Sequence, residues 1–281
     1  MPLGFAKSTF TYAAASAGAG NSGFYQSEFF DSDSQKAAHP MVDIGSGNNW
    51  HGISNFGKMS IMFWMKGTTS SLQSSFNNQV ILRTLASSSG DNGNFAEVTA
   101  SGFVLGSQKT NSSFKLIIWQ PSSFSSNYLD DEWHHFVFEL NGASSKVYAD
   151  GVNKSSEATL PSDGDNNPLG TTRFAFISGS TSTASNSSYS GFRTGKLQFA
   201  DVWMKFGTGD ALVSNIGSIY SSGWVDLGDD GTISGTLADP DIFLSVDSDA
   251  LASDLRSGAS VSVLKGTSNA NLITSSTGGA D

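Results

Sequence analysis

The sequence predicts an all-β sandwich. Charged residues make up only 14% of the 281 residues, where about 25% is typical of soluble domains, while hydrophobic residues make up 38%. Serine, threonine, glycine and asparagine take the place of the charges, and these residues favour turns and strand faces over helix interiors. Short apolar segments alternate along the chain with clusters of turn residues, which is the pattern of a sandwich.

The strands are expected where apolar residues gather over strand length. Met59–Lys66 is mostly apolar and predicts a buried central strand. Asn141–Gly142 predicts a hairpin turn, because both residues tolerate a positive φ. The other expected strands cover residues 80–85, 103–105, 114–119, 133–140, 146–151, 173–177 and 196–204.

One helix is expected within the body, over Ala211–Ser221. Its apolar residues recur at helical spacing on one face, and Asp210 can cap its N-terminus. The polar segments 87–94, 163–167 and 179–190 are expected to be loops at the rims of the sandwich.

The composition argues against several partners and compartments. There is no cysteine, so packing and ladder hydrogen bonds must hold the fold together. The net charge of −10 offers no basic stripe for a phosphate backbone or an anionic membrane. No apolar run approaches the roughly 18–20 residues of a membrane helix, and no signal peptide is recognised. We therefore expect synthesis in the cytoplasm, with neither nucleic acid nor a membrane as partner.

Five motifs in order resemble the laminin-G-like family of concanavalin-type jelly rolls. They are the core strand ending in Phe63–Lys66, the strand start Asp131–His135, the turn Tyr148–Gly151, the closing strand Gly195–Val202 and the helix Leu212–Tyr220. The resemblance covers about residues 41–226 and implies a concanavalin/laminin-G-like sandwich. It also permits a calcium ion at a loop rim.

The C-terminal segments are similar to the extension of laminin-G-like proteins in marine bacteriophages. These segments are Val225–Gly231, Pro240–Ser245 and Leu264–Thr267. The resemblance implies a component of the virion. The expected organisation is an N-terminal arm over residues 1–40, a sandwich over 41–226 and a C-terminal extension over 227–281.

The carboxylates and histidines do not form a catalytic pattern. Retaining glucanases on this sandwich place acid and nucleophile on one strand, and no Glu-x-Asp-x-x-Glu occurs here. Glutamates stand isolated on different segments, at Glu97, Glu132, Glu139 and Glu157. Adjacent His134 and His135 would point to opposite faces of a strand, one packed and one at the surface. No Gly-x-Ser-x-Gly elbow is present. We therefore expect no enzyme.

Two pairs of residues are candidates for ligand or subunit contacts. Asp163 and Asp165 lie in the loop densest in hard oxygen ligands, where calcium is weighed against a plain solvated turn. Trp50 and Trp224 stand in turn-rich segments and are candidates for a ligand or a neighbouring subunit. The other tryptophans fall in apolar strand patterns and are expected in the core: Trp64, Trp119, Trp133 and Trp203.

Two functions follow as hypotheses. The first is a structural protein of a bacteriophage virion, in head decoration, tail or fibre, assembled with other virion subunits as a homo-oligomer. The arm supports assembly, since its seven aromatic residues among small ones need a surface to cover them. The alternative is a carbohydrate-binding adhesion module for host surface glycans.

Overall fold

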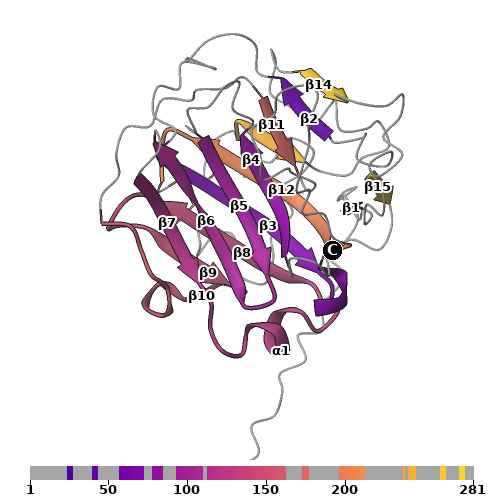
Figure 1. The fold of residues 1–281 in the computed structure, drawn as a ribbon, viewed down its shortest axis with the longest axis horizontal. Helices are drawn as coiled ribbons and strands as arrows, with labels where there is room; N and C mark the ends of the chain where they lie inside the picture. Colours follow the sequence, from indigo (N-terminus) through magenta and orange to yellow (C-terminus); the bar gives the residue numbers. More distant parts are fainter. Residues whose placement is uncertain are drawn as a thin grey trace, which may run out of the picture.

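A computed structural model shows two antiparallel sheets stacked face to face (Figure 1). The structure describes residues 24–27, 40–43, 57–72, 78–84, 93–109, 113–162, 173–176, 196–209, 211–212, 237, 240–244, 260–263 and 272–275. Within these ranges the chain is mostly β, which confirms the all-β prediction, and no helix there is long and apolar enough to cross a membrane.

Sheet A is built around the strand that the sequence marks as central. In this sheet β3 (Met59–Lys66) lies between β8 (His134–Leu140) and β12 (Gln198–Phe206). On the β8 side the sheet continues through β9 (Lys146–Ala149) to β10 (Val152–Asn153). On the other side β12 pairs with β1 (Phe24–Ser27) and β13 (Ile242–Leu244), and β1 pairs with β15 (Leu272–Ser275).

Sheet B contains a continuous meander along the chain. It runs from β4 (Asn78–Thr84) through β5 (Gly93–Thr99) and β6 (Gly102–Lys109) to β7 (Ser113–Trp119). On the far side of β4 lie, in order, β11 (Arg173–Phe176), β2 (Pro40–Asp43) and β14 (Ser260–Val263). After β7 the short helix α1 (Phe124–Tyr128) leads the chain across to β8 in sheet A.

The alternation of side chains along β3 and β8 places one set between the sheets. Aromatic rings dominate this layer, and Phe103 of sheet B is at its centre. The Phe103 ring centroid lies 5.8 Å from that of Phe63, 4.7 Å from that of Phe136 and 5.3 Å from that of Phe124. Because these rings come from both sheets and from α1, one cluster joins all three.

The opposite set of side chains forms a second apolar layer on the outer face of sheet A. It contains Met62, Val137 and Trp203 from three adjacent strands, packed with Leu212 and Phe243 from the chain that follows β12. The segment after β12 therefore covers the outer face of the sheet here.

Strands from both ends of the chain take part in the sheets. β1 lies in the predicted arm, and β13, β14 and β15 lie in the predicted C-terminal extension. The boundaries at 40/41 and 226/227 stay predictions.

Two elements differ from the sequence prediction. The loop expected over residues 87–94 is too long, because β5 begins at Gly93. The strand was missed because Ala96 and Glu97 weaken its apolar alternation. The expectation of a single helix over Ala211–Ser221 is also wrong, because α1 is present; of that expected helix only residues 211–212 are described, and they form a turn.

The hairpin predicted at Asn141–Gly142 is confirmed, because β8 and β9 pair as antiparallel neighbours, but its connection is longer than two residues. Asn141 and Gly142 begin a longer connection between β8 and β9, in which only Gly142 has a positive φ (56°). Asp150 and Gly151 instead form the tight turn between β9 and β10, with φ of 48° and 74°. Two successive positive φ values match the right-handed twist of the paired strands.

The different burial of two tryptophans predicts different losses of stability when each is replaced by alanine. Trp119 is fully buried and touches Phe103, whereas Trp133 is only partly buried against Trp64, which corrects its expected place in the core. We expect Trp119→Ala to lower the free energy of unfolding by about 3–5 kcal/mol, and Trp133→Ala by clearly less. Chemical denaturation of both variants measures this, and equal losses would contradict the assigned burial.

Candidate functional site

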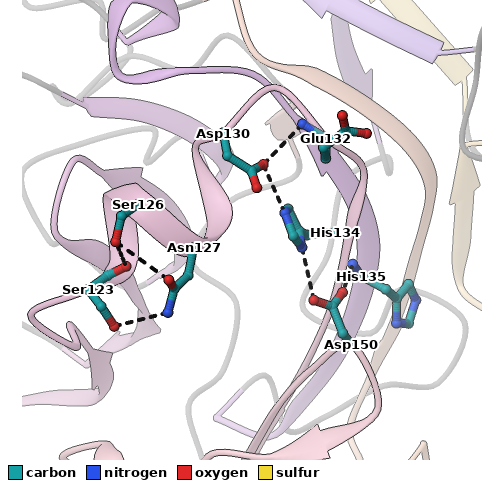
Figure 2. A network of polar contacts seen from close by, with 8 residues as sticks. All are labelled: Ser123, Ser126, Asn127, Asp130, Glu132, His134, His135 and Asp150. Atoms are coloured by element: carbon teal, nitrogen blue, oxygen red, sulfur yellow. Dashed lines mark hydrogen bonds and ion pairs between the residues drawn. The ribbon is translucent and has the colours of Figure 1, made fainter. Parts of the chain in front are cut away.

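A chain of polar contacts lies at the end of the sandwich where β8 begins (Figure 2). At its centre the His134 ring lies between two carboxylates. Its Nδ1 is 2.9 Å from Oδ2 of Asp150, and its Nε2 is 3.1 Å from Oδ1 of Asp130. The His134 side chain is mostly buried, whereas both aspartates are more than a third exposed.

The two carboxylates come from different segments, and a backbone N–H group holds each of them in place. Asp150 adopts its left-handed conformation in the β9–β10 turn, and its Oδ1 accepts the His135 N–H at 2.9 Å. Asp130 follows α1, and its Oδ1 also accepts the Glu132 N–H at 3.1 Å. Each aspartate therefore stabilises a local turn as well as contacting His134.

The loop that contains Asp130 and Asp131 is attached to the corner after β3. The Asp131 N–H donates to the Gly67 carbonyl at 3.0 Å, and Asp130 forms a bridge with Thr68. Gly67 has a φ of 152°, and a Cβ there would lie 2.6 Å from the Leu197 side chain. This positive φ would strain any other residue, and a Cβ would also require the Leu197 side chain to shift.

The surroundings favour a positive charge on His134. Burial lowers its pKa, but hydrogen bonds and charge attraction from Asp150 and then Asp130 outweigh burial, and the pKa lies above the usual 6.5. Tyr128 of α1 packs against the ring with centroids 5.2 Å apart. Burial, followed by the charges of Asp150 and Glu157, raises the pKa of Tyr128 to about 12, so that this phenol stays neutral.

His135 lies in the opposite environment, on the other face of the same strand. It is 1% exposed, and its ring centroid lies 5.0 Å from that of Trp64. Burial lowers its pKa to about 3. The predicted opposite faces and the packed ring are confirmed, whereas the expected surface ring is wrong, because His134 is mostly buried between Tyr128 and the two carboxylates.

This arrangement leaves His134 with a carboxylate at each ring nitrogen. A general base needs a nitrogen that can reach a substrate proton, and both nitrogens of His134 face carboxylates. Among the described residues, no three His, Cys, Asp or Glu side chains form a group that could hold a metal ion.

A second polar cluster lies on the outer face of sheet A, around the fully buried Glu139. Its carboxylate accepts the Ser60 hydroxyl, and its Oε1 accepts the Leu212 N–H at 2.6 Å. Ser60 Oγ in turn accepts the Ala211 N–H at 3.3 Å. Glu139 therefore fixes the chain after β12 onto the sheet.

The predicted contact residues all fall outside the described residues. This holds for Asp163 and Asp165 of the expected calcium loop, and for Trp50 and Trp224. The structure neither brings them together nor separates them.

The glutamates named from the sequence lie on separate elements. Glu97 is on β5, Glu132 is exposed before β8, Glu139 is buried on β8, and Glu157 pairs with Lys154 at 3.0 Å.

The cluster around His134 was not predicted as a unit. His134 and Asp150 stand in the Asp131–His135 and Tyr148–Gly151 motifs, and Asp130 directly precedes the first, but the distance between the motifs along the chain hid their contact. The sequence signal that could have indicated this contact is the pair Asp150–Gly151, which marks a tight turn beside the neighbouring strand.

Comparison with known proteins gives matches among solved structures. No family model matches the sequence, and no curated protein matches it. A heptameric SAP-like pentraxin from Limulus polyphemus is similar over 86% of this chain and 95% of its own, with a TM-score of 0.46 and 12% identity.

Two further matches are longer proteins. Mouse laminin α1 domains LG4-5 match over 65% of this chain, with a TM-score of 0.41 and 10% identity. The binding domain of botulinum neurotoxin serotype D matches over 67%, with a TM-score of 0.40 and 16% identity. This chain spans 40% of the length of each. The two antiparallel sheets confirm the predicted all-β sandwich.

His135 predicts a loss of stability in acid. The unfolded chain binds a proton at this histidine below about pH 6.5, and the folded chain does so only near pH 3. Its contribution is therefore complete above about pH 6.5 and falls by up to about 1.4 kcal/mol per pH unit on the way to pH 3. The free energy of unfolding of His135→Gln should fall less steeply than that of the wild type over this range. Parallel curves would contradict the assignment.

The buried contacts of Glu139 predict that its glutamine and alanine variants differ in stability. In Glu139→Gln the amide oxygen can still accept the Leu212 N–H, whereas Glu139→Ala leaves that buried donor unsatisfied. We expect the alanine variant to lose about 2–3 kcal/mol of stability and the glutamine variant less. Thermal and urea denaturation check this, with the exposed Glu132→Ala as control. If Glu139→Ala were as stable as the control, the cluster would not anchor the segment.

Proposed function

We propose that this chain is a non-catalytic structural protein of a bacteriophage particle, in head decoration, tail or fibre, that assembles as a homo-oligomer. The non-catalytic part of this proposal is supported by what the ionisable side chains of the chain bind. In the described part of the chain, the carboxylates of Glu139, Asp150 and Asp241 bind backbone amides.

Two buried carboxylates, Glu139 and Asp241, have a structural role. Glu139 binds the backbone at Leu212, and Asp241 accepts the Phe206 N–H at 2.8 Å. The Asp241 N–H also donates to the Met204 carbonyl at 2.8 Å, which fixes the start of β13 against β12. Such groups stabilise a single arrangement of the chain, which suits a building block of a particle.

The sequence supports the virion part of the proposal. The segments from Val225 to Thr267 resemble extensions of marine phage proteins, and the aromatic-rich arm needs a surface to cover it. One of these segments, Pro240–Ser245, contains β13, which pairs with β12. In this proposal the chain is made in the host cytoplasm and its partners are other virion subunits.

A carbohydrate-binding adhesion module is the second candidate. The observation that favours it is Trp133, whose partly buried indole follows the exposed Asp131 and Glu132 at the surface. An aromatic face beside carboxylates can stack on a sugar and accept its hydroxyl protons. Host surface glycans would then be the ligands.

Native mass spectrometry and electron microscopy of the purified chain test the first proposal. We expect a homo-oligomer of defined symmetry, since subunits of a particle associate through repeated interfaces. A glycan array provides the contrast, with Trp133→Ala as the matched variant. A monomer at every concentration that binds glycans only with Trp133 intact would overturn the structural proposal in favour of adhesion. Hydrolysis of a glycan would overturn the non-catalytic part of both.

A further inference from the structure

The contacts of His134 specify its protonation state. A neutral imidazole carries one N–H and one lone pair, whereas the imidazolium donates from both nitrogens. Both nitrogens lie within 3.1 Å of a carboxylate oxygen, from Asp150 on one side and Asp130 on the other. Only the cation satisfies both contacts, and the neutral ring turns its lone pair toward one of the carboxylates.

The two carboxylates belong to different segments, and the His134 ring contacts both of them. Asp150 closes the turn between β9 and β10, and Asp130 begins the loop that leads to Trp133 (Figure 2). The side chains of Asp130 and Asp150 are 39% and 44% exposed, so water can solvate either one when it is released.

We propose that His134 is a proton-controlled clamp, which ties the loop of residues 130–133 to the β9–β10 turn when the ring is cationic and releases that loop when the ring is neutral. The loop carries the partly buried Trp133, so its release changes the surface at this end of the sandwich. This device goes beyond the proposed function and holds for either candidate.

The charges that face the ring come from each element around it. Asp130 and Glu132 lie on the loop, Asp150 is in the turn, and Tyr128 of α1 stays neutral because its pKa is about 12. Farther out, the carboxylate of Glu157 is paired with Lys154 at 3.0 Å. His135 is neutral on the opposite face. The local charge is therefore negative, which agrees with the raised pKa of His134.

The direction of the response follows from that shift. The folded chain holds the proton to a higher pH than the unfolded one, so the clamp is complete below about pH 6.5. It is lost as the pH rises through the pKa of His134 in the folded protein.

The variant Asp150→Asn removes the dependence of the clamp on a proton and keeps the contacts that the fold needs. Asparagine tolerates the left-handed conformation, and its oxygen can still accept the His135 N–H. Its amide nitrogen would replace Oδ2 and donate to Nδ1, while Nε2–H donates to Asp130. A neutral His134 then satisfies both neighbours, and the clamp no longer depends on a proton.

Hydrogen exchange of the full chain, read as protection factors over pH 5.5–9, is the test. The reporters are the amides of Asp131 and Glu132, which bond Gly67 and Asp130. In the wild type we expect their protection to fall about tenfold as the pH rises through the pKa of His134, equivalent to about 1.4 kcal/mol. In Asp150→Asn it should stay level, and amides of β3 should stay level in both proteins.

A second measurement does not depend on the variant. The NMR shifts of the His134 ring in the wild type should titrate above pH 6.5 together with the reporter amides. Titration below 6.5, level protection in the wild type, or the same pH response in a folded Asp150→Asn would each overturn the clamp. If Asp150→Asn does not fold, the coincidence of ring titration and amide protection in the wild type decides the question.

Discussion

The packing of aromatic rings around Phe103 is the contact on which the rest of the structure depends. The chain has no cysteine, so apolar contact must hold the sheets face to face. Phe103 reaches Phe63 and Phe136 in sheet A and Phe124 in α1, so one ring touches both sheets and the helix between them. Because α1 leads directly into β8, this packing also sets where the His134 end of the strand lies.

Around that core, charged side chains hold the connections in place. Asp150, Glu139 and Asp241 each accept a backbone N–H from another segment. A buried N–H without a partner costs about 1–3 kcal/mol, so each carboxylate favours one conformation of the chain it binds. These three carboxylates therefore stabilise junctions between segments that are distant along the chain.

The two histidines show how one strand creates opposite electrostatic environments. His134 and His135 are neighbours, yet the first faces carboxylates at the rim and the second packs against Trp64 under the outer layer. Alternation along the strand gives this separation, and the sequence was sufficient to predict it. The carboxylates that raise the pKa of His134 come from a turn and a loop, and their approach needs the paired strands.

The sequence by itself determined the fold class, the central strand Met59–Lys66 and the burial of Trp64, Trp119 and Trp203, because composition and alternation are local properties. It missed β5 and α1, and it predicted Trp133 to be more deeply buried than it is. Those features depend on neighbours distant in sequence. Only the tertiary structure brought Asp130 and Asp150 to the two sides of His134, because strand pairing and packing, rather than residue type, decide which side chains meet.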